Sequence, residues 1–175
     1  MKRSARRRTS IADRINAYVG SDAPLRTIAG NWSRVAKVAI DEAKSLSLER
    51  IEVRLARLPK QLDGFRIIHL SDIHHSPFTG LDHIERTVRI CNRLRPDMVV
   101  LTGDYVSHEA EYIKPVAKAL GELRSRLGTF GCLGNHDHWT DADLVTRHLV
   151  DNSITMLINS GSRFEADGAA FWLAG

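Results

Sequence analysis

The segment Phe65-Arg-Ile-Ile-His-Leu-Ser-Asp-Ile-His-His75 decides the fold, because a predicted apolar strand is followed directly by side chains of types that can bind metals. Two later segments repeat this order. Residues 97–102 precede Gly103-Asp104, and residues 129–133 precede Gly134-Asn-His-Asp137. In an open α/β sheet, ligands gather at the carboxyl ends of the strands. The sequence therefore predicts that three strands bring carboxylates, an amide and imidazoles to one edge of a sheet.

Helical spacing of apolar residues separates these strands, and this alternation favours an α/β layered fold. The predicted helices cover residues 81–95, 111–126 and 141–151. Further short strands are predicted at residues 154–158, 162–165 and 170–173. Residues 51–58 alternate apolar and polar side chains with a period of two, which predicts a half-buried strand before the first motif.

The chain of 175 residues is long enough for one sizeable domain, preceded by two segments of different composition. Residues 1–27 are polar and basic, which is typical of a flexible tail. Residues 28–48 repeat apolar side chains at three- and four-residue steps, which predicts an amphipathic helix. That helix packs on the main domain or lies on a membrane surface. Residues 49–175 form the domain that carries the motifs.

The net charge of +4 comes from the tail, because residues 1–8 contain five basic side chains and no acid. The remainder holds 20 basic and 21 acidic residues, which disfavours nucleic acid as the partner. The chain lacks the roughly 18 consecutive apolar residues of a membrane span, so we expect a soluble protein. Cys91 and Cys132 are expected to be reduced core thiols. We predict a cytoplasmic location, with contact to the inner face of the membrane through the tail and helix as an alternative.

The residue types suit a pair of divalent cations. Asp72 and His74 lie two apart, so in an extended segment both point to one side and can hold one metal. Asp104 follows a glycine that permits a sharp turn, and its carboxylate can bridge two ions. Asn135 can offer a neutral amide oxygen. Mixed nitrogen and oxygen ligands favour Mn first, with Fe, Zn or Co as alternatives, and two such ions about 3.5–4 Å apart would orient a phosphoryl group and activate a water.

In this order, the motifs resemble those of the calcineurin-like metallophosphoesterases, in particular a bacterial branch that includes cell-envelope phosphoesterases and a UDP-diacylglucosamine hydrolase. The resemblance covers about residues 50–175 and implies a four-layer α/β/β/α sandwich with mixed sheets. It implies hydrolysis of phosphomonoester, phosphodiester or pyrophosphate bonds in a phosphorylated small molecule or a lipid-linked substrate. It also implies a role for each motif residue: Asp72 and His74 hold the first metal, Asp104 bridges both, Asn135 binds the second, His136 protonates the leaving oxygen and Asp137 orients that imidazole.

The sequence departs from the family after the third motif. Family members complete the site with later histidines, two of them in a Gly-His-x-His motif, whereas only His138 and His148 follow here. We therefore expect the chain to be the N-terminal half of such a domain and a poor catalyst by itself. A truncated, non-catalytic binding or scaffold module is the alternative.

Several nearby side chains receive separate interpretations. His69 lies within a strand and is expected to be a packed core imidazole rather than a ligand. His75 follows His74 and either lines the substrate side or caps a loop. Tyr105 and Phe78 are expected to border the pocket because they lie next to the motifs.

Overall fold

The computed structural model describes residues 46–175. The predicted tail, residues 1–27, lies outside this range, as does the predicted helix at 28–48 apart from its last three residues, which carry no regular secondary structure. Contacts divide the chain into Met1–Leu48 and Glu49–Gly175, and the second unit is the one described below. Among the described residues, no helix combines the length and the apolar character needed to cross a membrane.

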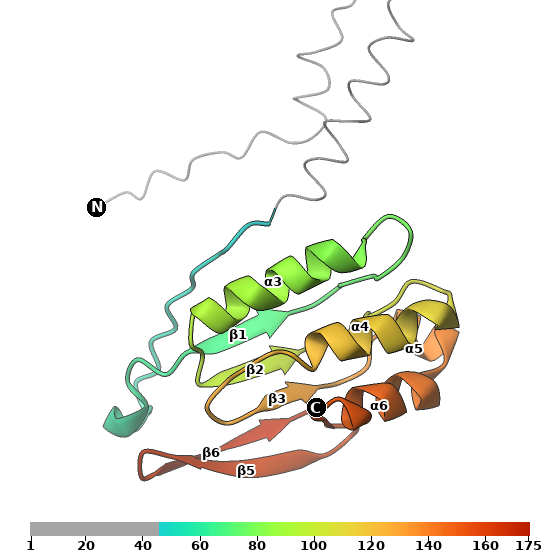
Figure 1. Ribbon diagram of the computed structural model, residues 1–175. Coiled ribbons are helices and arrows are strands. Elements are labelled where there is room, and N and C mark those ends of the chain that lie inside the picture. Colours follow the sequence, from blue (N-terminus) through green and yellow to red (C-terminus); the bar gives the residue numbers. More distant parts are fainter. Residues whose placement is uncertain (1–45) are drawn as a thin grey trace, which may run out of the picture. The chain divides into compact units, whose positions relative to one another are not determined.

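A four-stranded parallel sheet forms the centre of this unit, in the order β1-β2-β3-β4 (Figure 1). Ile68 is paired with Val99, Val99 with Thr129 and Phe130 with Thr155, so the strands are aligned in register. The strands span Ile67–Leu70 (β1), Met98–Leu101 (β2), Thr129–Gly131 (β3) and Ile154–Met156 (β4).

Three helices connect the strands: α3 (Leu81–Arg93), α4 (Ile113–Leu120) and α6 (Ala142–Asp151). Because consecutive parallel strands are joined by right-handed crossovers and the strand order never reverses, all three helices lie on the same face of the sheet. The shorter helices are η1 (Lys60–Leu62), η2 (Ala110–Tyr112) and α5 (Asn135–Thr140). The chain ends in a hairpin of β5 (Gly161–Ala166) and β6 (Ala169–Ala174).

Side chains of β2 alternate between two apolar clusters. Val99 and Leu101 belong to the larger cluster, with Val88 of α3 and Val116 of α4. Met98 belongs to the second cluster, with Phe130, Leu157 and apolar side chains of the β5–β6 hairpin. Both faces of the sheet at β2 are therefore covered, which is why this strand reads as a continuous apolar run.

Arg126 ties the hairpin to the sheet. Its guanidinium donates to Asp97 Oδ1 (2.8 Å) at the start of β2 and to both carboxylate oxygens of Asp167 (3.1 and 2.9 Å). Asp167 (φ 53°) and Gly168 (φ 81°) form the tight turn of the hairpin, in the left-handed region that Asp-Gly turns favour. The hairpin is thereby held at one end of the sheet by charged hydrogen bonds and along its length by the second cluster.

The α/β fold with a parallel sheet is confirmed, and the strands and helices from residue 65 onward fall where the periodicity predicts them. All four strands of the central sheet are parallel, so the four-layer arrangement with mixed sheets stays a prediction. The predicted helix 111–126 is shorter than expected, because the α-helix ends at Leu120 and Gly121 follows as its cap.

The predicted strand at residues 51–58 is wrong. These residues form no strand, and the apolar side chains of Ile51, Val53 and Leu55 are 81%, 66% and 60% exposed. A period of two shows which side chains share a face, but a strand also needs a neighbouring edge for its backbone hydrogen bonds. Within the described residues, this segment meets no such edge. His69 is also not a core imidazole, because it is exposed and its Nε2 lies 2.7 Å from Thr102 Oγ1.

Candidate metal centre

The loops that follow β1 and β2 continue side by side beyond the sheet. The amide of Asp72 donates to Gly103 O (3.2 Å), and that of His74 donates to Asp104 O (2.9 Å). The amide of His75 then donates to Tyr105 O (2.9 Å). These backbone bonds carry the strand pairing into the loops, so the side chains of the first two motifs are held next to each other at the carboxyl edge.

Two glycines let the second and third motifs approach closely. A Cβ on Gly103 would overlap the backbone of Gly134, and a Cβ on Gly134 would overlap the carboxylate and amide of Asp104. Gly103 also has φ 93°, a conformation that side chains rarely adopt. Both positions therefore require glycine, which places Asp104 against the start of α5.

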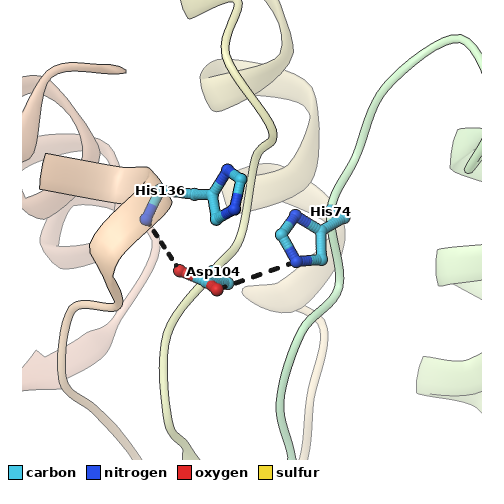
Figure 2. Close-up of side chains that lie close together, drawn as sticks. All are labelled: His74, Asp104 and His136. Atoms are coloured by element: carbon cyan, nitrogen blue, oxygen red, sulfur yellow. Dashed lines mark hydrogen bonds and ion pairs between the residues drawn. The ribbon is translucent and has the colours of Figure 1, made fainter. Parts of the chain in front are cut away.

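His74, Asp104 and His136 converge at this edge, one from each motif loop (Figure 2). Their ligand atoms all lie within 4.8 Å of one another, the only such group among residues 46–175. His74 Nε2 lies 3.7 Å from Asp104 Oδ2, and the His136 amide donates to Asp104 Oδ1 (2.9 Å). One carboxylate is thus flanked by two imidazoles, whose ring centroids are 4.6 Å apart.

Ser107 contacts both imidazoles. Nδ1 of His136 lies 2.8 Å from the Ser107 carbonyl oxygen, and because a carbonyl only accepts, this nitrogen carries the proton. In the neutral ring, Nε2 of His136 is then the nitrogen with a free lone pair. The Ser107 hydroxyl lies 3.5 Å from His74 Nδ1, a long contact on the far side of that ring from Asp104.

Asp137 has partners other than the imidazole that the family resemblance implied. It is completely buried, and its carboxylate accepts from the amides of Asp104 (2.8 Å), Tyr105 (2.9 Å) and Gly134 (2.9 Å). Burial raises the pKa of this carboxyl group above its ordinary value, although the hydrogen bonds from the backbone amides act in the opposite direction. Asp137 therefore joins the second and third motif loops, while the Ser107 carbonyl holds the His136 ring.

Three of the motif residues have strained backbones. Asp72 (φ 53°), His74 (φ 47°) and Asp104 (φ 55°) all adopt the left-handed conformation without being glycine. Such a conformation costs on the order of 1 kcal/mol or more for each residue and persists only where the surroundings enforce it. A cluster of such residues around one carboxylate favours a functional interpretation of this edge.

Asp72 and Asn135 lie at the margin of the cluster. Asp72 Oδ1 is 3.9 Å from His74 Nε2, but its side chain is 69% exposed and its other oxygen accepts from the Ser71 hydroxyl (2.6 Å). Asn135 is exposed at the start of α5, next to His136. His136 therefore belongs to the group of three converging side chains, although the sequence analysis placed it at the leaving oxygen of the substrate and not among the metal ligands.

Other residues near the motifs also have settled positions. His75 is buried, with Nδ1 donating to Thr79 O (2.8 Å), which agrees with a loop-capping role. Tyr105 does not border a pocket, because it is buried and its hydroxyl donates to Cys132 O (2.9 Å). Burial raises the pKa of this phenol. Phe78 is exposed, and its place at the border of a pocket stays a prediction.

Sequence reasoning missed three neighbours of His136, one of which is His108, whose ring centroid lies 5.1 Å from that of His136. Ser107 acts partly through its backbone carbonyl, which no residue pattern reveals. Trp139 follows His136 by three residues, and that spacing on a helix could have indicated contact had α5 been predicted. The His136 and Trp139 ring centroids lie 4.7 Å apart.

The comparisons with known proteins agree with this geometry. A family profile described as calcineurin-like phosphoesterase matches residues 65–167. A "transmembrane protein with metallophosphoesterase domain" from Bos taurus is 35% identical over 131 residues, which cover 74% of this chain and 30% of that protein.

Two bacterial relatives carry more specific names. The "UDP-2,3-diacylglucosamine pyrophosphatase LpxG" of Chlamydia muridarum is 36% identical over 57% of this chain and 30% of its own length. The "phosphodiesterase YaeI" of Escherichia coli is 30% identical over 73% of this chain and 48% of its own length. The chain thus spans between about a third and a half of the length of these relatives.

Proposed function

The chain belongs to the calcineurin-like phosphoesterase family, and from that premise we propose that it supplies the metal- and phosphate-binding edge of a metal-dependent phosphoesterase. The observation that carries the proposal is the convergence of His74, Asp104 and His136, whose ligand atoms lie within 4.8 Å of one another. The bonds attacked would be phosphoric esters or diphosphates, in keeping with the names of the phosphodiesterase and pyrophosphatase relatives.

The donor set suits divalent transition metals. The proposed ligands are the His74 imidazole, the Asp72 and Asp104 carboxylates and the Asn135 amide oxygen, and this mixed nitrogen and oxygen set favours Mn, Fe, Zn or Co over Ca, which prefers oxygen. Two ions, with Asp104 shared between them, Asp72 and His74 on one side and Asn135 on the other, remain our proposal for the full centre. When bound, such ions would supply Lewis acidity toward the phosphoryl oxygens and a water of lowered pKa.

His136 has the geometry of a group that handles a proton. Its Nδ1–H is held by the Ser107 carbonyl (2.8 Å), so the ring cannot turn without losing a hydrogen bond. Protonated at Nε2, the imidazole would stabilise charge on the leaving oxygen and donate a proton to it. Asp137 would act indirectly, by fixing the loop that carries Asp104.

The substrate class and the location follow as coarser proposals. One relative is named for a diphosphate that carries a diacylated sugar, which supports a phosphorylated small molecule or a lipid-linked substrate. A cytoplasmic position, with the basic residues 1–8 contacting anionic lipid at the inner membrane face, remains a proposal on the basis of charge.

The test separates ligand from proton donor. Asp104→Ala, His136→Ala and the control His148→Ala, on α6, would be compared for bound Mn²⁺ by elemental analysis and for hydrolysis of bis(4-nitrophenyl) phosphate. Asp104→Ala should lose metal. His136→Ala should keep it and lower the rate of hydrolysis, by up to about 10²–10⁴-fold. The control should match the wild type in both.

Two outcomes would count against this division of roles. If His136→Ala lost metal as completely as Asp104→Ala, His136 would be a ligand and not the proton donor. If the wild-type chain bound Mn²⁺ and phosphate but showed no turnover that His136→Ala reduced, the chain would be a binding module, the second function considered.

A further inference from the structure

The proposed proton donor has an exposed aromatic neighbour. Trp139 lies in α5 three residues after His136, on the same side of the helix, and the two ring centroids are 4.7 Å apart. The Trp139 residue is 67% exposed. His108 approaches His136 from the second motif loop, with its ring centroid 5.1 Å away. The His136 imidazole therefore lies next to the rings of Trp139 and His108 as well as that of His74, and the exposed indole is the largest of the three.

The helix α5, which carries Trp139, is fixed to its surroundings by hydrogen bonds. The same short helix contains Asp137, which is buried and bonded to three backbone amides, and Thr140, whose hydroxyl donates to His136 O (2.9 Å). The backbone of Trp139 therefore has a fixed position relative to that of His136. Because Trp139 is 67% exposed, its indole offers apolar surface beside His136 that a bound ligand could cover.

We propose that Trp139 is a specificity-determining residue that stacks on the leaving group of the substrate, an inference that rests on the proposed phosphoesterase function. If His136 donates its proton to the leaving oxygen, the group attached to that oxygen lies next to the Trp139 indole, whose ring centroid is 4.7 Å from that of His136. The site then prefers phosphoesters and diphosphates whose leaving group carries a planar or apolar portion over those with a small polar one. Tryptophan suits this role because it offers a large, rigid face at little cost in conformational entropy.

Binding of two phosphonates to the Zn²⁺-loaded chain tests the proposal without requiring turnover. Phenylphosphonate and methylphosphonate present the same anionic head and differ in a planar ring, and isothermal titration calorimetry gives Kd for each. Wild type should bind phenylphosphonate about 10-fold more tightly, the range expected for one aromatic contact. Trp139→Ala should bring the ratio to within about twofold of one, whereas Trp139→Phe should retain most of it. The control Trp172→Ala, which removes a 71% exposed indole from β6, should match wild type.

Each result bears on a different claim. An equal preference in wild type and Trp139→Ala would overturn the stacking proposal and leave the proposed function standing. Failure of both phosphonates to bind would overturn the proposed phosphate site and the inference with it. A concentration-dependent dimer that Trp139→Ala abolishes would show that the indole contacts a second copy, and would also overturn the inference. Unchanged thermal melting of Trp139→Ala would show that its effect is not a loss of fold.

Discussion

Replacing Asp137 by asparagine should destabilise the fold even in the absence of metal. The carboxylate accepts from three amides, two at Oδ2 and one at Oδ1. In its better orientation, the asparagine oxygen keeps the bonds from Asp104 and Gly134, and its NH₂ group then faces the Tyr105 amide, donor against donor. One bond to a charged acceptor is lost, at about 1.5–3 kcal/mol, and two become neutral bonds that are weaker by about 1 kcal/mol each.

The cost of burying a charge opposes this loss of stability, because asparagine, unlike aspartate, brings no charge into a completely buried position. We therefore expect a net loss of about 2–4 kcal/mol in the free energy of unfolding. For a domain of this size, that corresponds to a melting temperature lower by about 10 °C. The measurement is urea and thermal unfolding in EDTA, which removes metal binding from the comparison.

A matched control is available in Asp141→Asn. Asp141 caps α6 by accepting from the Leu144 amide (2.9 Å), and asparagine is an equally good cap, so this variant should stay within about 0.5 kcal/mol of wild type. If Asp137→Asn were as stable as Asp141→Asn, the three amide bonds would not hold the motif loops together and the reasoning would be refuted.

The same comparison has a predicted pH dependence. Burial raises the pKa of Asp137 above the ordinary value of 3.8, so the native state keeps this proton to a higher pH than the unfolded chain does. The stabilisation from protonation is complete below the ordinary pKa and is lost as the pH rises through the raised value. The difference in the free energy of unfolding between wild type and Asp137→Asn should therefore decrease as the pH rises from 3.8 to the raised pKa of Asp137, and remain constant above it.

Two further predictions concern the close approach of the motif loops and the segment before the sheet. Gly134→Ala should weaken Mn²⁺ binding at least about 10-fold, because the added Cβ would displace the Asp104 carboxylate. The control Gly168→Ala, in the hairpin turn, should lower the free energy of unfolding by about 1–2 kcal/mol and leave the Mn²⁺ affinity intact. Equal Mn²⁺ affinities of the two variants would contradict this prediction. Ile51→Ala should change the free energy of unfolding by less than about 0.5 kcal/mol, whereas Ile113→Ala, at a 1% exposed position, should cost about 2–5 kcal/mol in urea unfolding. A cost above about 1 kcal/mol at Ile51 would mean that residues 51–58 are packed after all.

Most of the fold was predictable because its signals are local. The apolar run of β2 reflects burial on both faces, and the spacing of Ile84, Val88 and Cys91 reflects one buried face of α3. The order of three motifs, each after a strand, likewise predicted that His74 and Asp104 would meet, because the carboxyl ends of parallel strands share one edge. These inferences needed only the periodicity of each element and the topology of a parallel sheet.

Residues 51–58 show where local information stops. Their alternation is as regular as that of any strand, yet the described unit offers no edge to pair with them. Whether a strand forms depends on a partner that is distant in sequence, since the hydrogen bonds of a strand are made between chains or chain segments. Side-chain periodicity carries no record of that partner.

The details of the site were decided by tertiary structure. The residue types of the three motifs indicated metal and phosphate chemistry, and the glycine before Asp104 indicated a sharp turn of the backbone there. Only the folded chain shows that the Ser107 carbonyl, and not Asp137, holds the His136 ring, and that Asp137 instead binds the amides of two loops. The physical reason is that backbone carbonyls and amides are present at nearly every position, so the sequence cannot say which of them a side chain meets until the loops are in place.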